Sequence, residues 1–339
     1  MRSFDKENFI KDINDGLALR SQIEKIIDEI WENKFDSIFF IGIGGTYASS
    51  MQVEVYLRGK SNLPIYVENA AEFLTNGNKR FTKDSICIIS SVTGNTLEMV
   101  NLVDRVHEIG GRVFSFIDTP NSILTQQDKQ DYLIVAPKNE QLKFYMVANY
   151  LMYLNNEFPD YKDYNENMEN YLANALAQVE IDSDKWAYNF AKNKVNFVNK
   201  NPDLPHYFVG SGNLWGLTYS YSMCYWEEQM WIRTKSITCQ EFFHGMQEII
   251  DKDTPITLFI GEDSQRPLAE RVGHFLPKIN SNYTIIDTKE FELEGIKTEY
   301  RGTISHHVIH GVNNRIDAYM ELFLRHPLSI RRYYRQFEY

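Results

Sequence analysis

The sequence is poor in cysteine: Cys87, Cys224 and Cys239 are three in 339 residues, with no C-x-x-C spacing. Disulfide frameworks and zinc knuckles need paired or clustered thiols, so neither is expected. The sequence also lacks any run of eighteen apolar residues, and its first twenty residues mix charged with apolar side chains. We therefore expect no membrane-spanning helix and no secretory signal, and the expected location is cytoplasmic.

Positive charge is scarce as well. The 35 lysines and arginines stand against 46 aspartates and glutamates, which gives a formal net charge of −11. Such a chain has no general attraction for nucleic acid or for anionic membranes, and no local basic patch offsets this, so neither partner is expected. With 43% hydrophobic residues the chain can bury a core, and its length suits two domains.

One local pattern occurs twice: a short apolar run is closed by glycines and followed by a helix-compatible stretch. It spans residues 36–50 (DSIFFIGIGGTYASS) and residues 204–226. Each copy is followed by further strand candidates that alternate with helical stretches. This alternation predicts an α/β protein with two doubly wound parallel sheets in tandem.

The domain organisation follows from these patterns and from the breakers between them. We expect an N-terminal helix and a first domain over residues 1–160, and a second domain over 201–325. Helical spacing that ends in Asn-Pro and Leu-Pro predicts linking helices over 161–200. Residues 326–339 remain as a C-terminal tail.

The glycine loops do not fit a dinucleotide. The fingerprint G-x-G-x-x-G is approached in both halves, but Tyr47 and Trp215 stand where the third glycine should let helix and strand pack closely. We therefore expect no nicotinamide or flavin, and no other cofactor.

A better candidate for anion binding is the run ISSVTGNTLEMVNLV at residues 89–103, an apolar strand that leads into polar residues and then a helix. The polar positions are Ser91, Thr93, Asn95 and Thr96. Hydroxyls and backbone N–H groups at a helix N-terminus can hold a phosphate. A simple helix cap would need only one such residue. Thr46 in the first glycine loop is a natural extra donor.

Acid-base chemistry is suggested by WEEQMWIRTKSITCQEFFHG, residues 226–245. Glu228 lies among apolar rings near the end of a helical pattern, a setting that suits a general base, whereas Glu227 points about 100° away and should be solvated. His244, which starts another helix, can take and give a proton. The structural alternative is a hydrogen-bonded glutamate and a histidine that fills a core gap.

The separation of this pair raises a problem. In one continuous helix, sixteen residues would put Glu228 and His244 about 24 Å apart. Either KSITC forms a strand that folds the chain back, or the two groups serve different copies of the site. A third cluster, His306, His307 and His310, has zinc-like spacing but no completing ligand nearby, so no metal is expected, and one of these histidines is expected to line the pocket.

These stretches together resemble the sugar isomerase (SIS) family of phosphosugar enzymes, through GIGGTYASS, SSVTGNT and above all QEFFHG. Within that family, EFFHG, EIIDKDTP and the tail RHPLSIRRYYRQFEY are most similar to the fructosamine-6-phosphate deglycases. The resemblance implies two SIS domains in tandem and a homodimer or higher homo-oligomer with shared active sites. It also places the C-terminal tail over the active site.

The resemblance assigns roles residue by residue. It implies that Glu228 is the catalytic base and His244 the ring-opening histidine. The implied phosphate-binding residues are Thr46, Ser91, Thr93 and Thr96. Gly45 and Arg332 are weaker candidates for contacts with the sugar, since a lysine stands near the latter position in the related synthase. Val92 replaces a polar residue of that synthase's loop.

The expected function is hydrolysis of a 6-phosphorylated sugar–amino acid adduct, such as fructoselysine or glucoselysine 6-phosphate, to a hexose 6-phosphate and the free amino acid. An aldose–ketose isomerase or an amino-sugar phosphate deaminase could use the same base and histidine. A non-catalytic phosphosugar sensor is the third reading, although a sensor needs neither group. The attached amino acid and its carbon of attachment stay open.

Overall fold

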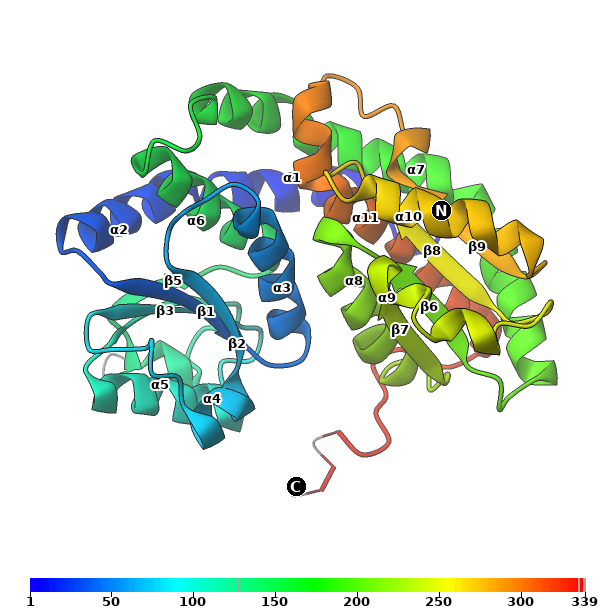
Figure 1. The fold of residues 1–339 in the computed structure, drawn as a ribbon, viewed down its shortest axis with the longest axis horizontal. Coiled ribbons are helices and arrows are strands. Elements are labelled where there is room, and N and C mark those ends of the chain that lie inside the picture. Colours follow the sequence, from blue (N-terminus) through cyan, green and yellow to red (C-terminus); the bar gives the residue numbers. More distant parts are fainter. Residues whose placement is uncertain (127–128, 335, 338–339) are drawn as a thin grey trace. The chain divides into compact units, whose positions relative to one another are not determined.

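The computed structural model describes residues 1–126, 129–334 and 336–337, and it confirms the predicted α/β class. The chain divides into two compact units, Lys11–Glu169 and Met1–Ile10 with Asn170–Tyr339. Each unit contains one parallel sheet flanked by helices (Figure 1). Across the described ranges, no helix has the length and apolar character needed to cross a membrane.

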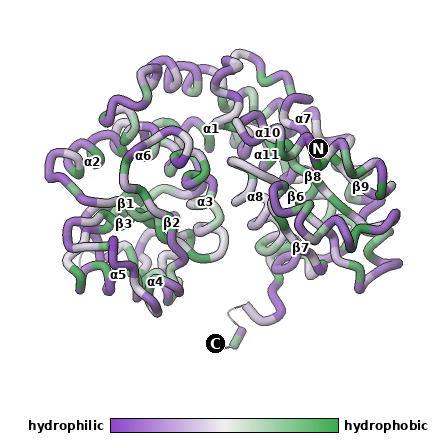
Figure 2. Tube along the Cα trace, viewed as in Figure 1, coloured by the Kyte–Doolittle hydropathy of each residue, from purple (hydrophilic) through white to green (hydrophobic). Residues whose placement is uncertain are grey.

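The first unit contains a five-stranded sheet with the order β2-β1-β3-β4-β5, in which every pair is parallel. Its strands are β1 (Ser37–Gly42), β2 (Ile65–Asn69), β3 (Ser85–Ser91), β4 (Arg112–Ile117) and β5 (Tyr132–Val135). The runs SIFFIG and SICIISS are buried along their whole length. Uninterrupted burial is typical of a parallel strand that is covered on both faces, and Figure 2 shows these strands as hydrophobic segments within the unit.

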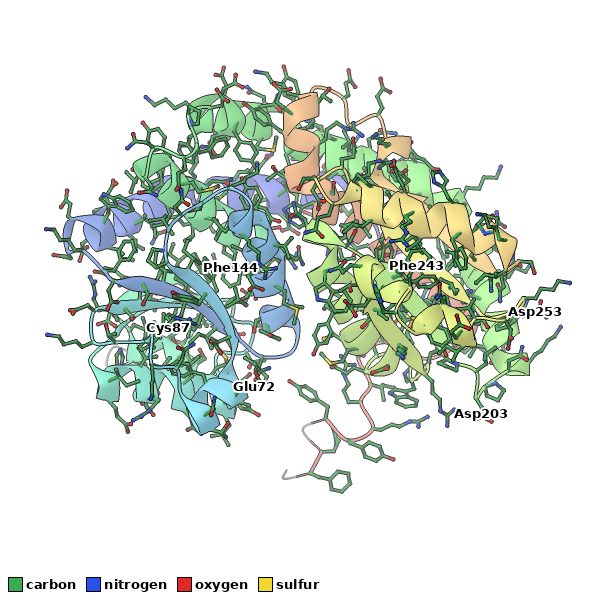
Figure 3. The ribbon with its side chains drawn as sticks, in the orientation of Figure 1. Glu72, Cys87, Phe144, Asp203, Phe243 and Asp253 are labelled. Carbon is green, nitrogen blue, oxygen red and sulfur yellow. The ribbon has the colours of Figure 1, made fainter. Side chains whose placement is uncertain are left out.

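The helices that cover this sheet begin where apolar spacing of the helical type resumes. They are α2 (Arg20–Glu32), α3 (Gly45–Arg58), α4 (Ala70–Asn76), α5 (Leu97–Ile109) and α6 (Glu140–Leu154). In α2 the residues Ile23, Ile27 and Ile30 are all fully buried, the stripe expected of an amphipathic helix. Cys87 and Phe144, labelled in Figure 3, are buried in the core of this unit.

Two helices contain the boundaries between the units. α1 (Lys6–Leu17) lies near the start of the chain, and α7 (Tyr161–Lys200) is one continuous helix of 40 residues. α7 occupies the range in which linking helices are predicted. Residues 1–32 contain two helices, α1 and α2, where the sequence predicts one.

The second unit contains a four-stranded parallel sheet with the order β7-β6-β8-β9. Its strands are β6 (His206–Gly210), β7 (Thr234–Thr238), β8 (Ile256–Ile260) and β9 (Tyr283–Asp287). The helices are α8 (Trp215–Ser220), the π-helix η4 (Tyr221–Glu227), α9 (Cys239–Phe242), α10 (Arg266–Phe275) and α11 (Thr298–Leu324). Short 3-10 turns are η1 (Ile123–Thr125) in the first unit, and η3 (Gly212–Leu214), η5 (Met246–Ile249), η6 (Leu276–Lys278) and η7 (Thr288–Glu290) in the second.

The two sheets share one topological feature that positions loops. In the first sheet the strand order reverses between β1 and β3, and in the second between β6 and β8. In open parallel sheets, ligands bind beyond the carboxyl ends of the strands at such a switch point. Each glycine loop predicted from the sequence follows the first strand of its switch point, β1 or β6.

Candidate functional site

The loop after β1 is an open glycine turn at the carboxyl edge of the first sheet. Gly42 ends β1, and a Cβ there would lie 2.6 Å from a backbone nitrogen of α3. Thr46 stabilises the turn, since its Oγ1 accepts from the N–H of Ile43 at 3.1 Å and donates to the Ile43 carbonyl at 3.0 Å. Apart from adjacent backbone and chain neighbours, no described atom lies within 4 Å of the position a Cβ would take at Gly44 or Gly45. The space beside this turn can therefore admit a ligand.

The loop after β3, the neighbouring strand, is braced by its own side chains. Ser91 ends β3 and is buried, and its Oγ accepts from the N–H of Gly94 at 3.0 Å. Thr93 Oγ1 accepts from the N–H of Asn95 at 3.3 Å. Gly94 has φ +62°, and a Cβ there would lie 2.0 Å from Ser122 Oγ, so only glycine fits. The structure thus brings the predicted phosphate residues of both loops to one switch point.

Thr96 differs from the other predicted phosphate residues. It precedes α5, and its side chain makes no capping hydrogen bond within the described part of the chain. The first-turn N–H groups and the dipole of α5 favour an anion at this end of the helix. Val92 is 59% exposed and offers no hydrogen-bond donor from its side chain. Of the four predicted phosphate residues, Thr96 therefore has the hydroxyl that is least engaged in hydrogen bonds of its own loop.

We expect Thr96→Val to raise the KM for a 6-phosphorylated substrate about tenfold, because one hydrogen bond to a charged group is lost. The melting temperature should stay unchanged, since the hydroxyl caps no helix N–H. Thr46→Val is the matched comparison, and it should lower the melting temperature because Thr46 makes two loop hydrogen bonds. Steady-state kinetics and thermal unfolding measure both. An unchanged KM in Thr96→Val would remove Thr96 from the phosphate site.

The corresponding loop in the second unit is filled by a carboxylate of the protein itself. Asp263 follows β8, and it accepts from the N–H of Asn213 at 2.6 Å and from the N–H of Gln265 at 2.8 Å. Gly212 has φ +60°, and a Cβ there would lie 2.2 Å from Asp263 Oδ2. Burial raises the pKa of the Asp263 carboxyl group, and the two backbone donors oppose that shift. This loop therefore has its anion site occupied internally.

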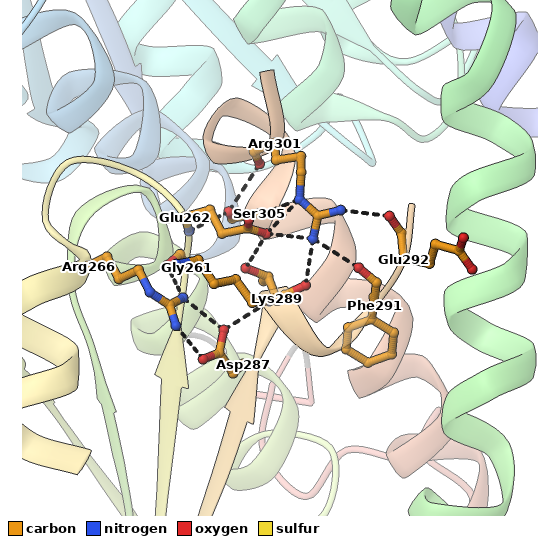
Figure 4. A network of polar contacts seen from close by, with 10 residues as sticks. Gly261, Glu262, Arg266, Asp287, Lys289, Phe291, Glu292, Arg301 and Ser305 are labelled. Carbon is orange, nitrogen blue, oxygen red and sulfur yellow. Dashed lines mark hydrogen bonds and ion pairs between the residues drawn. The ribbon is translucent and has the colours of Figure 1, made fainter. Parts of the chain in front are cut away.

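Two partly buried ion pairs hold the rest of this edge (Figure 4). Arg301 on α11 binds the carboxylate of Glu262 through Nε and Nη2, both at 2.9 Å. Arg266 at the start of α10 binds Asp287 in the same two-pronged way, at 2.8 and 2.5 Å. These pairs attach α10 and α11 to the ends of β8 and β9. The charged groups that follow β8 and β9 at the carboxyl edge of the second sheet are thus paired with other groups of the protein.

Glu228 lies at the end of the π-helix η4. The N–H of Glu228 donates to the carbonyl of Met223 at 3.0 Å, and the N–H of Met230 donates to that of Tyr225 at 3.1 Å. Both bonds span five residues, whereas an α-helix spans four, and such turns are frequent at functional sites. Trp226 is fully buried and anchors the turn in the core. The extra residue per turn decides which way the end of this helix presents Glu228.

The other anchor of the π-helix is a hydrogen bond to α11. Tyr221 donates through its hydroxyl to Asp317 Oδ1 at 2.8 Å. Burial raises the pKa of Asp317 from 3.8 to about 7. The folded protein therefore holds a proton on Asp317 that the unfolded chain has already released between about pH 4 and pH 7.

The sign of the resulting pH dependence follows from that difference. In this window the folded state binds more protons, so the contribution of Asp317 to stability falls as the pH rises, by at most about 1.4 kcal/mol per pH unit. We expect Asp317→Asn to lack this decline. Urea unfolding at pH 5 and pH 7 measures it, and equal pH dependence in the two proteins would contradict the expectation.

A pocket of about 600 Å³ opens beside Glu228 within the second unit. Its charged lining residues are Asp203, Glu227, Glu228, Arg233, Arg331 and Arg332. Arg331 Nε donates to Glu228 Oε1 at 2.6 Å, and the two side chains are 21% and 33% exposed. Arg332 lies over the ring of Trp231 at 4.1 Å. The C-terminal tail thus contributes to the walls of the pocket that holds the predicted base.

His244 lies at the other end of β7 from Glu228. The pocket of Glu228 includes Thr234, the first residue of β7, whereas His244 follows α9, which begins directly after that strand. Five residues of strand span about 17 Å. KSITC does contain a strand, but the strand separates the pair. His244 is exposed and is not among the residues that line the pocket of Glu228.

The cluster His306, His307 and His310 lies on α11. His306 is buried and its ring lies 4.0 Å from that of His307. Burial lowers the pKa of His307 to about 3, and the neighbouring His310 adds to that shift. Among the described residues no group of three or more His, Cys, Asp or Glu side chains has an arrangement suited to a metal ion. None of the three histidines lines the pocket of Glu228.

The comparisons with known proteins agree with the family that the sequence resembles. Residues 30–155 match the SIS domain, so the resemblance to that family is confirmed and the first unit carries a SIS domain. Fructosamine deglycase FrlB of Bacillus subtilis (strain 168) is 26% identical over 327 residues, which cover 94% of this chain and 97% of FrlB.

Solved structures extend the likeness to 94% of the chain. A Bacillus subtilis protein assigned as a phosphosugar isomerase has 25% identity and a TM-score of 0.82, over 94% of this chain and 100% of that one. A Salmonella typhimurium LT2 protein with the same assignment has 21% identity and a TM-score of 0.87, over 94% and 97%. At 21% identity, the Salmonella typhimurium structure shows a shared fold alone.

Proposed function

We propose that this protein is a deglycase that hydrolyses a 6-phosphorylated sugar–amino acid adduct, such as fructoselysine or glucoselysine 6-phosphate, to a hexose 6-phosphate and the free amino acid. The observation that carries the proposal is Glu228, a carboxylate held by Arg331 at 2.6 Å in a pocket of about 600 Å³. The likeness to a fructosamine deglycase over 94% of the chain supports it. The proposed phosphate contacts are the open glycine turn with Thr46 and the loop with Thr96.

In this mechanism His244 moves a proton from the anomeric hydroxyl to the ring oxygen and opens the sugar ring. Glu228 then removes a proton from the carbon next to the carbonyl while the carbonyl oxygen takes up a proton, which forms an enolamine. It delivers a proton to the former carbonyl carbon as the amine nitrogen gives up its N–H proton, which forms an imine. Water adds to the resulting imine, the carbon–nitrogen bond breaks, and the amine leaves with a proton. The phosphate does not react, and its binding energy serves to position the reacting atoms.

The direct test is to incubate the purified protein with fructoselysine 6-phosphate and with glucoselysine 6-phosphate and to assay released lysine and the hexose phosphate. Release of lysine is the expected result, and the hexose phosphate formed identifies the carbon of attachment. Interconversion of phosphosugars without release of lysine would instead favour a phosphosugar isomerase, which is the assignment of a structural relative at 25% identity.

We also propose that the site is completed by a second copy of the chain. Glu228 and His244 lie at opposite ends of β7, so a site that uses both can draw them from two protomers. In a mixture of Glu228→Gln and His244→Gln proteins, half of the dimers are mixed and each mixed dimer has one intact site. We therefore expect about a quarter of wild-type activity, measured after mixing under conditions that allow subunit exchange. No recovery despite confirmed exchange would argue for a site within one protomer.

A further inference from the structure

Most charges in the pocket beside Glu228 neutralise one another. Arg331 pairs with Glu228 at 2.6 Å, and its Nη1 also donates to the carbonyl of Leu328 at 2.6 Å. Arg233 pairs with Asp203 at 2.9 Å on the rim, where Asp203 is labelled in Figure 3. These two pairs account for four of the six charged side chains that line the pocket.

One cation and one anion remain, Arg332 and Glu227. Within the described part of the chain Arg332 has no acidic partner, and its guanidinium lies 4.1 Å from the ring centroid of Trp231. Glu227 has no basic partner among those same residues, and its Oε1 accepts from the hydroxyl of Thr234 at 2.7 Å. The pocket is therefore left with one group for an anion and one for a cation.

The position of Arg332 depends on the ring of Trp231. Trp231 has φ +58°, a conformation that is a rare exception for a bulky side chain and that persists only when the surroundings enforce it. The His326 ring packs on Trp231 at 4.1 Å, and His326 Nε2 lies 3.0 Å from the carbonyl oxygen of Gln229. Trp231 thus contacts both His326 and Arg332, which ties the tail to the end of the π-helix.

We infer that Arg332 and Glu227 recognise the amino acid half of the substrate, with Arg332 binding its carboxylate and Glu227 its ammonium group. The inference rests on the proposed function and adds the residues that determine specificity. A guanidinium offers two parallel N–H donors that match the two oxygens of a carboxylate. A carboxylate such as Glu227 accepts from an ammonium group in the same charge-assisted way.

This pair favours one class of adduct. Lysine joined to the sugar through its ε-amine keeps both the α-ammonium and the α-carboxylate, so it presents one charge of each sign to the pocket. An amino acid joined through its α-amine has no separate ammonium unless its side chain carries one. The structure thus favours lysine-type adducts linked through the side chain.

The experiment compares three 6-phosphorylated adducts that share one sugar and one attachment carbon. Their amines are lysine, pentane-1,5-diamine, which lacks the carboxylate, and 6-aminohexanoate, which lacks the α-ammonium. We expect the wild type to prefer the lysine adduct over either analogue by about tenfold in kcat/KM. Arg332→Gln should lower kcat/KM about tenfold for the two carboxylate-bearing adducts and leave the diamine adduct unchanged. Glu227→Gln should do the same for the two ammonium-bearing adducts.

The control is Arg105→Gln, which removes an exposed guanidinium that pairs with Glu108 in the first unit and should change none of the three values. Equal kcat/KM for the three adducts in the wild type would overturn the inference and leave deglycase activity intact. An equal loss for all three in Arg332→Gln would also overturn it, because Arg332 would then act on the shared sugar. Failure to cleave any adduct would overturn the proposed function itself, and the inference with it.

Discussion

Replacing Glu228 with glutamine is expected to lower kcat for lysine release by about 10³-fold, the scale on which general bases contribute. Glutamine keeps the size and the hydrogen-bonding shape of the side chain, but it cannot take a proton from carbon. In the proposed reaction Glu228 holds the proton between its removal from one carbon and its delivery to the next, and there it can exchange with solvent, so hexose phosphate formed by the wild type in D₂O should gain deuterium at a carbon. Mass spectrometry of the product detects this exchange.

The control for this variant is Glu72→Gln, at an exposed glutamate of α4 labelled in Figure 3, which should keep full activity. The KM of Glu228→Gln should change little, since the proposed phosphate contacts are made by other residues. Release of lysine at the wild-type rate by Glu228→Gln would remove Glu228 as the base. A loss of activity that accompanies a lower melting temperature would point to a structural role through Arg331 instead.

The second large effect is expected on stability, at the buried ion pair between α7 and α11. Arg315 Nε lies 2.5 Å from Glu180 Oε2, and the two side chains are 4% and 2% exposed. Arg315→Met leaves the Glu180 carboxylate buried without its cation. We expect the free energy of unfolding at pH 7 to fall by about 3–5 kcal/mol, as measured by urea denaturation.

The loss should shrink as the pH falls. Burial already raises the pKa of Glu180 above its usual value, and removing Arg315 raises it further, so the variant's folded state takes up a proton and escapes the cost of a buried charge. Arg315→Met combined with Glu180→Gln should recover most of the stability at pH 7. Arg58→Met, which breaks an exposed pair with Glu54, should cost less than about 1 kcal/mol. A comparable loss in both single variants would contradict the argument.

Much of the fold could be predicted because parallel strands buried on both faces leave a plain signal. SIFFIG and SICIISS each contain a continuous apolar run of four residues or more, and both are fully buried strands. The glycine turns were recognisable for a similar reason, since Gly42 and Gly94 sit where any side chain would collide with neighbouring atoms. Local geometry of this kind is decided by a few adjacent residues, so it appears in the sequence.

The site was less predictable, because its features depend on residues far apart in the chain. The π-helix that ends at Glu228 depends on contacts such as Tyr221 with Asp317, 96 positions away. The pairing of Glu228 with Arg331 spans 103 positions. The adjacent arginines of the tail were visible, but nothing in their spacing shows that one pairs with Glu228 and the other stacks on Trp231. A distinction of that kind needs coordinates.

The carboxylate of Asp263 gives the two halves of the chain different dependences on solution conditions. A ligand that is part of the chain has a fixed effective concentration, so the loop after β6 is occupied whatever the solution contains. An anion bound at the loops after β1 and β3 would come from solution, and it should raise the stability of the fold with the logarithm of its concentration. The glycine loop of the second unit thus behaves as a permanently liganded turn, whereas the loops after β1 and β3 can respond to the supply of an anion.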